Sequence, residues 1–315
     1  MNTHQVLLLS DDTATLLPAL EQSFESSPEL QVKFIAPVKV YPSDFIESEF
    51  IILDYAYSLK NPEAAKLAFA YPEKLSICAT LTEEQRDRQQ MNEILKTTKV
   101  SHFFGMSGSH TLGDIKHYLV ASITRQFWTV ETLITPPVSN RSRTVFSTTE
   151  HLDQQIVSAI GSHDLSHTFD GFKAILVQIL NEILTNALFN APVDEHGNFL
   201  HRDQNRRNKI ISAAGKEPSL EIVEDEDKII LSVKDFYGTL TKDVIDHYLT
   251  HGEVADKDGG AGVGLFLVLK HAHKVVINID PGKMTEFIIV IHKFKRFFHY
   301  QALEKSFHLF QRNRT

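Results

Sequence analysis

Cysteine is almost absent from this chain, since only Cys78 occurs among 315 residues. One thiol excludes an intrachain disulfide and a zinc site built from several thiolates, and it fits a reducing compartment such as the cytoplasm. Long apolar runs are also missing, because no stretch reaches the roughly eighteen apolar residues of a membrane span. No basic flank precedes the short apolar run at the N-terminus, which argues against a signal peptide. We therefore expect a cytoplasmic protein without a membrane span.

Positive charge is in deficit, with 32 Lys and Arg residues against 40 Asp and Glu residues and a net charge of -8. This balance argues against nucleic acid as the partner of the bulk of the chain. The 16 histidines are scattered and form no H-E-x-x-H pattern. His271 and His273 would point to different sides of a helix, so we expect solvent-exposed or helix-capping histidines. The length allows two domains with separate cores.

Apolar runs alternate with helical stretches over the first 127 residues. Five runs have the length and composition of buried strands: Gln5–Leu9, Leu30–Ile35, Phe50–Leu53, Leu75–Thr80 and Val100–Phe104. Helices are expected near residues 15–26, 83–96 and 112–127. Strands that alternate with helices predict an α/β fold with a doubly wound parallel sheet, whose ligand site lies at the carboxyl ends of the strands.

Polar residues follow several of these strands, at Asp11, Asp12, Asp54 and Thr80. In order and approximate spacing they resemble the receiver domains of response regulators, which implies a receiver/flavodoxin-like fold. In that family the acidic pair holds Mg²⁺, the Asp after the third strand accepts a phosphoryl group, and a Lys ends the fifth strand. Here the fifth strand ends in His102-Phe103-Phe104-Gly105-Met106, without that Lys.

The missing Lys normally contacts the phosphoryl group, so its loss should weaken phosphorylation and the switch that reads it. We therefore expect a degenerate receiver-like domain over residues 1–127 that serves docking or dimerisation. One alternative is that Asp54 is a working phospho-acceptor, with Asp11, Asp12 and Asp54 around Mg²⁺. Another is that Asp54 is a strand-end carboxylate without chemistry.

Residues 128–150 change character, because they contain Pro136-Pro137, many Ser and Thr residues, and no clear period. This composition predicts an interdomain linker or extended arm. Helical patterning resumes at His151, and Ser162-His163-Asp164-Leu165 resembles the start of the histidine-kinase phospho-acceptor box. The Thr-Pro that follows in that box is missing. We therefore expect His163 and His167 to be exposed helix or cap residues, with phosphotransfer as the alternative.

An amphipathic helix is predicted from Gly171 to Ala191. Apolar residues recur near the helical period at Ile175, Ile179, Leu180, Ile183, Ala187 and Leu188. Glu182, Asn186 and Asn190 stand four residues apart and therefore share one face of the helix. Such a polar row is ordinarily a solvated face, unless other parts of the chain supply matching groups.

Later stretches supply such groups. An acidic turn joins apolar runs at 219–223 and 228–234, which predicts a β-hairpin whose second strand ends in Asp235-Phe236-Tyr237-Gly238. The stretch 259–264 contains four glycines and leads into an apolar helix, an arrangement that brings backbone amides and a helix dipole to a phosphate. Strands at 275–279 and 285–290 close an antiparallel sheet.

In order, E-x-x-x-N, D-x-x-G, G-x-G-x-G-L and a Thr at the start of a late strand resemble the GHKL family of ATP-binding domains. That family includes histidine kinases, anti-sigma-factor serine kinases, gyrase and MutL. The resemblance covers residues 151–292. It implies an α/β sandwich of helices on a mixed sheet that binds ATP and Mg²⁺.

The resemblance implies a role for each matching residue. Asn186 would coordinate Mg²⁺, and Asn190 would lie near the phosphates. Asp235 would accept a hydrogen bond from the adenine amino group, Gly238 would let the base approach, and Thr285 would reach adenine through water. The lid around the triphosphate would be formed by Gly260, Gly262, Gly264 and Leu265.

Glu182 would act as general base toward water or a Ser hydroxyl in an ATPase or serine kinase of this family. In histidine kinases the corresponding Glu has a lesser role. The short stretch between Asp235 and Gly260 leaves little room for a long lid, and no two-helix phospho-acceptor domain precedes Glu182. Both points favour the anti-sigma type. The second motif departs from the usual D-x-G-x-G, and its Phe236 and Tyr237 imply extra aromatic bulk in the adenine pocket.

Residues 293–315 interleave basic and aromatic residues. Six apolar side chains could share one helical face: Phe294, Phe297, Phe298, Leu303, Phe307 and Phe310. We expect a C-terminal helix or tail that packs on its own domain or on a dimer mate. Contact with a membrane surface or an acidic partner is the alternative.

These features predict a cytoplasmic bacterial signalling kinase that binds ATP and Mg²⁺ and phosphorylates or sequesters a protein partner under control of the receiver-like domain. The partner would be a sigma-regulatory, response-regulator or phosphotransfer protein. One alternative is a catalytically silent switch or scaffold that uses nucleotide only to change partner affinity. A second is an unorthodox histidine kinase that acts on a separate phosphotransfer protein.

Overall fold

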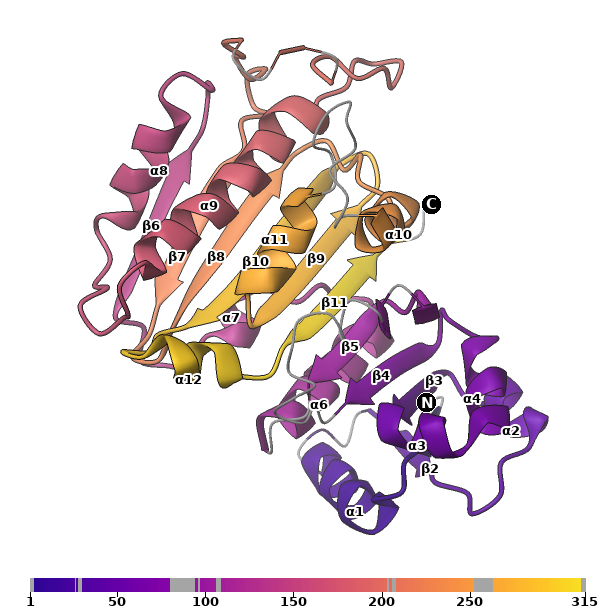
Figure 1. The fold of residues 1–315 in the computed structure, drawn as a ribbon. Coiled ribbons are helices and arrows are strands. Elements are labelled where there is room, and N and C mark those ends of the chain that lie inside the picture. The colour runs from indigo at the N-terminus through magenta and orange to yellow at the C-terminus, as the bar shows by residue number, and fades with distance from the viewer. Residues whose placement is uncertain are drawn as a thin grey trace. The chain divides into compact units, whose positions relative to one another are not determined.

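The computed structural model of the chain describes residues 3–25, 27, 30–79, 94, 95, 97–105, 109–202, 204, 205, 208–251 and 263–312. Within these residues the protein is mixed α/β, with eleven strands that pair in both parallel and antiparallel fashion. The chain divides into two compact units (Figure 1). The first comprises Met1–Trp128 and Glu304–His308, and the second comprises Thr129–Leu303 and Leu309–Thr315.

Five parallel strands form the centre of the first unit, in the order β2-β1-β3-β4-β5. Their bounds are β1 His4–Leu9, β2 Val32–Ile35, β3 Phe50–Asp54, β4 Leu75–Ala79 and β5 His102–Gly105. The inner strands are continuous apolar runs that are almost completely buried, as expected for a parallel sheet covered on both faces. The five strands predicted from the sequence are confirmed, with bounds that differ by one or two residues.

Helices connect these strands. Their bounds are α1 Thr13–Phe24, α2 Pro42–Glu47, α3 Tyr55–Lys60, α4 Pro62–Phe69 and α6 Ser109–Thr124. Helix α1 packs beside α6, and α4 packs beside both α2 and α3. The three short helices between β2 and β4 were not anticipated from the sequence. Thr80 and most of the helix expected over residues 83–96 lie outside the described residues.

The second unit is an antiparallel sheet with the order β9-β10-β8-β7-β6. The strand bounds are β6 Asn140–Val145, β7 Ser219–Glu224, β8 Lys228–Asp235, β9 Lys274–Asp280 and β10 Met284–His292. The hairpin β7–β8 and the pair β9–β10 confirm the strands predicted there. The helices are α7 Val130–Leu133, α8 Leu152–Ile160, α9 Phe172–Thr185, the π-helix η1 Asn186–Asn190, α10 Lys242–His251, α11 Val263–His271 and α12 Phe297–Ala302.

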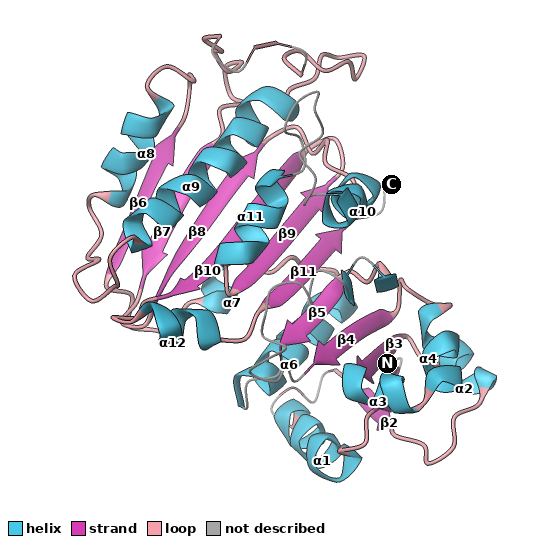
Figure 2. Cartoon of the chain, in the orientation of Figure 1, coloured by secondary structure: helices cyan, strands magenta, loops and turns pink. Residues whose placement is uncertain are grey.

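Helix α9 is the central helix of the second unit. Figures 1 and 2 show α8, α9 and α11 side by side across one face of the sheet, with α9 in the middle. Its apolar stripe, which includes Leu176, Ile179 and Leu180, is completely buried against the strands. The stretch Phe172–Asn190 is long and apolar enough to cross a membrane by length and composition, yet 56% of it is buried inside the protein, as is usual for a core helix.

The segment 128–150, which was predicted to be a linker or extended arm, contains regular secondary structure. This segment contains α7 and the strand β6, which pairs with β7 from Asn140↔Glu224 to Val145↔Ser219. Residues of β6 alternate between half-buried and exposed, but both sets are mostly polar. The backbone ladder to β7, rather than an apolar period, therefore defines this strand, and composition alone could not indicate it.

The C-terminal segment, which was predicted to be a helix or tail, contains both a helix and a strand. Helix α12 ends at Ala302, and the strand β11 follows from Ser306 to Gln311. In the first unit Phe307 of β11 pairs antiparallel with Phe103 of β5, and in the second unit the Arg312 amide donates to the Ile279 carbonyl at 3.0 Å. Residues 306–310 are all buried. A strand that is buried on both faces shows no alternation, so its apolar residues also matched a helical face.

Two histidines expected at the surface are buried. His273 is 4% exposed, and its Nδ1 accepts from the His292 amide at 3.1 Å. Its Nε2 must therefore carry the proton, which it donates to the Tyr300 carbonyl at 2.9 Å. His163 is 7% exposed and lies between a serine and a glutamate. Both rings are satisfied by partners distant in the sequence, which is why the local pattern did not indicate burial.

Candidate functional site

One cavity of the second unit gathers most of the residues singled out in the sequence. It has a volume of about 820 Å³ and lies among α9, η1, α10, α11, β8 and β10. Seven predicted site residues line it: Glu182, Asn186, Asn190, Asp235, Gly264, Leu265 and Thr285. These residues come from four separate parts of the chain. Gly260 and Gly262 lie outside the described residues.

The polar row on α9 forms a ladder of hydrogen bonds. Asn190 Nδ2 donates to Asn186 Oδ1 at 2.7 Å, and Asn186 Nδ2 donates to Glu182 Oε1 at 3.3 Å. The backbone widens into the π-turn η1 over Asn186–Asn190, and such π-turns occur frequently at functional sites. The ladder fixes the orientation of both carboxamides. Two amide oxygens and a carboxylate at one wall of a cavity are the oxygen donors that Mg²⁺ prefers.

Asp235 supplies a buried carboxylate to the same cavity. It ends strand β8 and is 7% exposed. Burial raises its pKa, and the backbone amides of Tyr237 and Gly238, which donate to Oδ1 at 2.9 and 3.1 Å, counteract that effect. A carboxylate accepts about four hydrogen bonds, so Asp235 can take a further donor from within the cavity. Thr285 lies directly opposite it in the β8–β10 ladder.

Two glycines of the predicted motifs lack room for a side chain, for different structural reasons. Gly264 lies against Glu182, so that a Cβ at this position would overlap the Glu182 carboxylate. Gly238 has φ +62°, and a Cβ there would overlap the Asp280 carbonyl oxygen. Gly238 is not among the residues that line the cavity. Its small size therefore serves the packing of the turn after β8 against the end of β9.

The aromatic bulk expected beside Asp235 is absent from the lining of this cavity. Neither Phe236 nor Tyr237 is among the residues that line the cavity. Lys216 holds this turn from outside, because its Nζ donates to the Phe236 carbonyl at 2.5 Å and lies 5.4 Å from the centre of the Tyr237 ring. The departure from the usual motif thus adds neither aromatic side chain to the lining of the cavity.

Sequence reasoning missed several residues of the cavity wall. Phe199, Arg202, Thr239 and Tyr248 line it, from the segment after η1 and from the region of α10. The Arg202 guanidinium lies 5.0 Å from the centre of the Phe199 ring. Among the described residues of the lining, Arg202 carries the positive charge that could meet a phosphate. The basic composition of residues 192–218 was visible in the sequence, but nothing local indicated which arginine faces the site.

The acidic residues of the first unit make other contacts. Asp54 caps helix α3, because its Oδ1 accepts from the Ala56 amide at 2.9 Å, and its Oδ2 accepts from Ser10 at 3.0 Å. Asp11 pairs with Lys60 at 2.6 Å, and this hydrogen bond raises the pKa of the Lys60 ammonium. Over the described part of the chain, no group of three or more His, Cys, Asp or Glu residues could hold a metal ion. The Mg²⁺ set of Asp11, Asp12 and Asp54 is therefore not assembled.

Cys78 lies in β4, beside Asp54 in the sheet register. It is buried, and desolvation together with the Asp54 charge raises the pKa of its thiol far above the ordinary value. A thiol that stays protonated is a poor nucleophile and a poor metal ligand. Cys78 is therefore a packing residue of the first unit.

Comparisons with known proteins do not identify the function of this site. No protein family and no curated protein matches the chain. Among solved structures, one titled "Crystal structure of CapF with inhibitor 3-isopropenyl-tropolone" aligns with 98% of this chain and 99% of that chain, at 8% identity and a TM-score of 0.25. A similarity this low carries no argument about fold or function.

Proposed function

We propose that the second unit is a GHKL-type domain that binds ATP together with Mg²⁺. The observation that carries this proposal is the convergence of Glu182, Asn186, Asp235, Gly264 and Thr285 on one cavity. A volume of about 820 Å³ is within the range that small-molecule and cofactor sites usually have. The residues come from all four motifs of the resemblance, in the order that the family requires.

The chemistry of the lining fits the parts of the ligand. Asn186, with Glu182 and Asn190 beside it, offers oxygen donors to Mg²⁺, which when bound neutralises part of the triphosphate charge. Asp235 is a buried acceptor suited to the adenine amino group, and Thr285 lies next to it. Gly264 and Leu265 lie in the first turn of helix α11, whose N-terminal region favours negative charge. Arg202 adds a positive charge to the lining.

Glu182 is the candidate general base of a kinase. Its side chain is half-buried in the cavity wall, hydrogen-bonded to Asn186 and held beside Gly264. A carboxylate fixed in this way can take the proton of a Ser hydroxyl or of water when that group lies within hydrogen-bonding reach. The protein would then be a cytoplasmic bacterial kinase of a sigma-regulatory, response-regulator or phosphotransfer protein, and the first unit would be a degenerate receiver-like module for docking or dimerisation.

A silent nucleotide switch is the second candidate function. It is favoured by the hydrogen bond from Asn186 to Glu182 Oε1, which occupies one oxygen of the candidate base. In that case nucleotide would only shift partner affinity. Glu182 separates the two functions, since the kinase needs its carboxylate for turnover and the switch does not.

Calorimetric titration with ATP and a non-hydrolysable analogue, with and without Mg²⁺, tests the nucleotide site. We expect binding that requires Mg²⁺ and weakens at least tenfold, or about 1.4 kcal/mol, in Asn186→Ala and Asp235→Ala. Asn181→Ala is the matched control, because Asn181 lies on the same helix but bonds to Asp153 and does not line the cavity. Equal affinity in all variants, or no binding by the wild type, would reject the proposal.

A further inference from the structure

A second polar constellation of the same unit is independent of the nucleotide cavity. Ser142 Oγ lies 2.8 Å from His163 Nε2, and His163 Nδ1 lies 3.1 Å from Glu224 Oε2. Ser142 comes from the edge strand β6, His163 follows α8, and Glu224 ends β7. The order Ser–His–carboxylate, with one hydrogen bond on each ring nitrogen, is the geometry of a nucleophile, its base and the group that orients the base.

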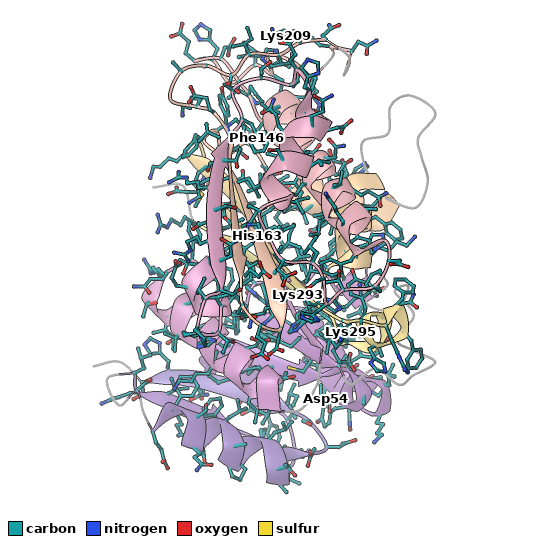
Figure 3. All side chains as sticks on the ribbon, turned by 90° about the vertical axis from the view of Figure 1, so that its left-hand side faces the viewer. Asp54, Phe146, His163, Lys209, Lys293 and Lys295 are labelled. Atoms are coloured by element: carbon teal, nitrogen blue, oxygen red, sulfur yellow. The ribbon has the colours of Figure 1, made fainter. Side chains whose placement is uncertain are left out.

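The hydrogen bonds around Glu224 orient this relay. Glu224 is 2% exposed, its Oε1 accepts from Lys293 Nζ at 3.0 Å, and its Oε2 also accepts from the Asp164 amide at 3.3 Å. Both oxygens of Glu224 thus accept hydrogen bonds, and Oε2 can also accept from His163 Nδ1. In the neutral ring Nε2 is then the acceptor that faces Ser142 Oγ. Figure 3 labels His163 and Lys293, two of the partners of Glu224.

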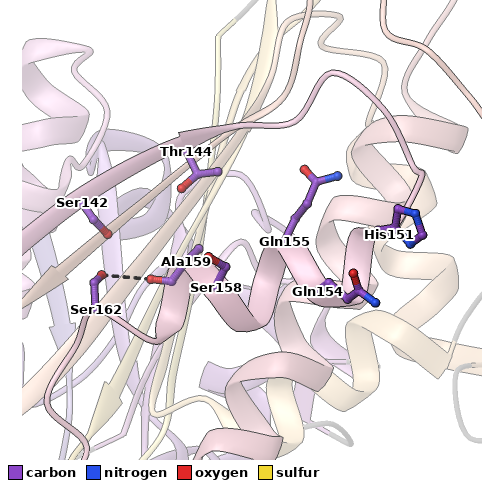
Figure 4. Close-up of a pocket in the computed structure, with 8 residues that line it drawn as sticks. All are labelled: Ser142, Thr144, His151, Gln154, Gln155, Ser158, Ala159 and Ser162. Atoms are coloured by element: carbon purple, nitrogen blue, oxygen red, sulfur yellow. Dashed lines mark hydrogen bonds between the residues drawn. The ribbon is translucent and has the colours of Figure 1, made fainter.

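Ser142 connects the buried relay to an open pocket. The His163 side chain is fully buried, whereas Ser142 is half-buried and lines a pocket of about 500 Å³. Figure 4 shows Ser142 and Thr144 on the strand, facing the helix that carries Gln154, Gln155 and Ser158. The pocket shares no lining residue with the nucleotide cavity. Only the serine of the relay is presented to a ligand, as a nucleophile should be.

The ladder of β6 places a backbone donor next to this serine. The Phe146 amide donates to the Pro218 carbonyl at 2.9 Å, which continues the β6–β7 register. Because antiparallel strands alternate between hydrogen-bonded and non-hydrogen-bonded pairs, Ser142 and Thr144 turn their amides toward β7. The intervening amide of Arg143 is therefore directed to the side away from β7. It follows the nucleophile in the chain and can stabilise an oxyanion that forms on an acyl group at Ser142.

We propose that Ser142, His163 and Glu224 form a nucleophilic triad that accepts acyl groups from small activated esters. Ser142 Oγ forms a bond to the carbonyl carbon, the bond from that carbon to the leaving group breaks, and the leaving group departs as its anion. The proton of Oγ passes to His163 Nε2. Nε2 releases this proton to solvent and then takes a proton from a water molecule that attacks the acyl carbon. The bond from that carbon to Oγ breaks, the acid is released, and Oγ recovers its proton from Nε2. The polar lining favours a small, polar acyl group.

Covalent labelling of the full-length protein with a small alkyl fluorophosphonate tests the proposal. Attack by Ser142 forms an O–P bond and releases fluoride, and peptide mass spectrometry locates the adduct. Ser158 and Ser162 line the same pocket and are more exposed than Ser142, so they are internal controls for accessibility. We expect the adduct on Ser142 in the native protein and its loss in Ser142→Ala, whereas Ser158→Ala should label like the wild type.

The role of His163 as base is tested by the labelling rate. His163→Gln should lower the rate at Ser142 by about 10² or more, which is the usual contribution of a general base. Since a buried histidine variant could fail to fold, the wild type in denaturant provides a second comparison and should not label at Ser142. Absence of a Ser142 adduct in the native protein, equal labelling of Ser142, Ser158 and Ser162, or an unchanged rate in folded His163→Gln would each overturn the proposal.

Discussion

Gly264 and Glu182 lie in direct contact, and a single methyl group added to Gly264 would overlap the Glu182 carboxylate. The two residues are 82 positions apart in the chain, on helices α9 and α11, which pack against each other. This contact joins the E-x-x-x-N row to the glycine-rich stretch. It makes the position of the candidate base depend on a residue with no reactive group.

Gly264→Ala should therefore displace Glu182 and impair the nucleotide site. We expect ATP affinity or turnover to fall at least tenfold, about 1.4 kcal/mol, measured by calorimetry and by phosphate release. Gly113→Ala is the matched control, because nothing lies within 4 Å of a Cβ placed there in α6. That change should stabilise the protein by about 0.5–1 kcal/mol and leave nucleotide binding alone. Full activity of Gly264→Ala would show that Glu182 is not confined as described.

Glu182→Gln should separate kinase from switch. The amide keeps the volume and the acceptor for Asn186 but cannot take a proton, so a kinase should lose turnover by 10²-fold or more. ATP affinity, measured by calorimetry, should change by less than about fivefold in either case. The silent switch would be favoured if the wild type showed no turnover and Glu182→Gln bound the partner as the wild type does.

Asp235→Asn should change the pH dependence of stability. Because burial raises the pKa of Asp235, the folded chain binds this proton more tightly than the unfolded chain. The contribution of the Asp235 carboxyl to the free energy of unfolding is therefore fully present below about pH 3.9. It falls as the pH rises through the folded-state pKa. Each tenfold difference in proton affinity is worth about 1.4 kcal/mol.

Asn carries no charge, so it does not lose stability as the pH rises. Asp235→Asn should therefore unfold at a higher temperature than the wild type at pH 7, and the difference in unfolding temperature should become smaller toward pH 4. Calorimetric unfolding at several pH values measures this difference. The same variant should bind ATP more weakly, since a carboxylate acceptor is replaced in part by a donor. A variant less stable than the wild type at pH 7 would show that the hydrogen bonds to Tyr237 and Gly238 outweigh burial.

His292 should contribute in the opposite direction. Burial, with the Lys228 and Lys274 charges nearby, lowers its pKa to about 4. The unfolded chain then binds a proton that the folded chain does not, so this contribution is present above about pH 6.5 and is lost as pH falls toward 4. Urea unfolding should show the wild type losing up to about 3 kcal/mol more than His292→Gln between pH 7 and pH 4. The prediction would be contradicted if the free energy of unfolding changed with pH in the same way in both proteins.

Asp54 should behave as a helix cap. Asp54→Ala removes the acceptor for the Ala56 amide and should cost the first unit about 1 kcal/mol, whereas Asp54→Asn should cost less because Asn is also a good cap. Denaturant unfolding monitored on the full-length protein measures both. Incubation with acetyl phosphate supplies the counter-test, since a stable mass increase at Asp54 would support a working receiver rather than a docking module.

Local periodicity in the sequence determined the main elements of the protein. The row Glu182, Asn186 and Asn190 follows from a helical spacing of four, and the buried strands of the first unit follow from short apolar runs. Asp235 could be placed at a strand end because a turn glycine follows three residues later. Such features depend on a few neighbouring residues, and for that reason they can be predicted without the fold.

Only the tertiary structure decided which residues meet. The edge strand β6 has polar residues on both faces, so its place was fixed by hydrogen bonds to β7, and the buried position of β11 gave its residues no period of two. Arg202 reaches the proposed nucleotide cavity from an irregular segment, and Ser142, His163 and Glu224 are brought together from three distant elements. Long-range packing creates such sites, and no local pattern records it.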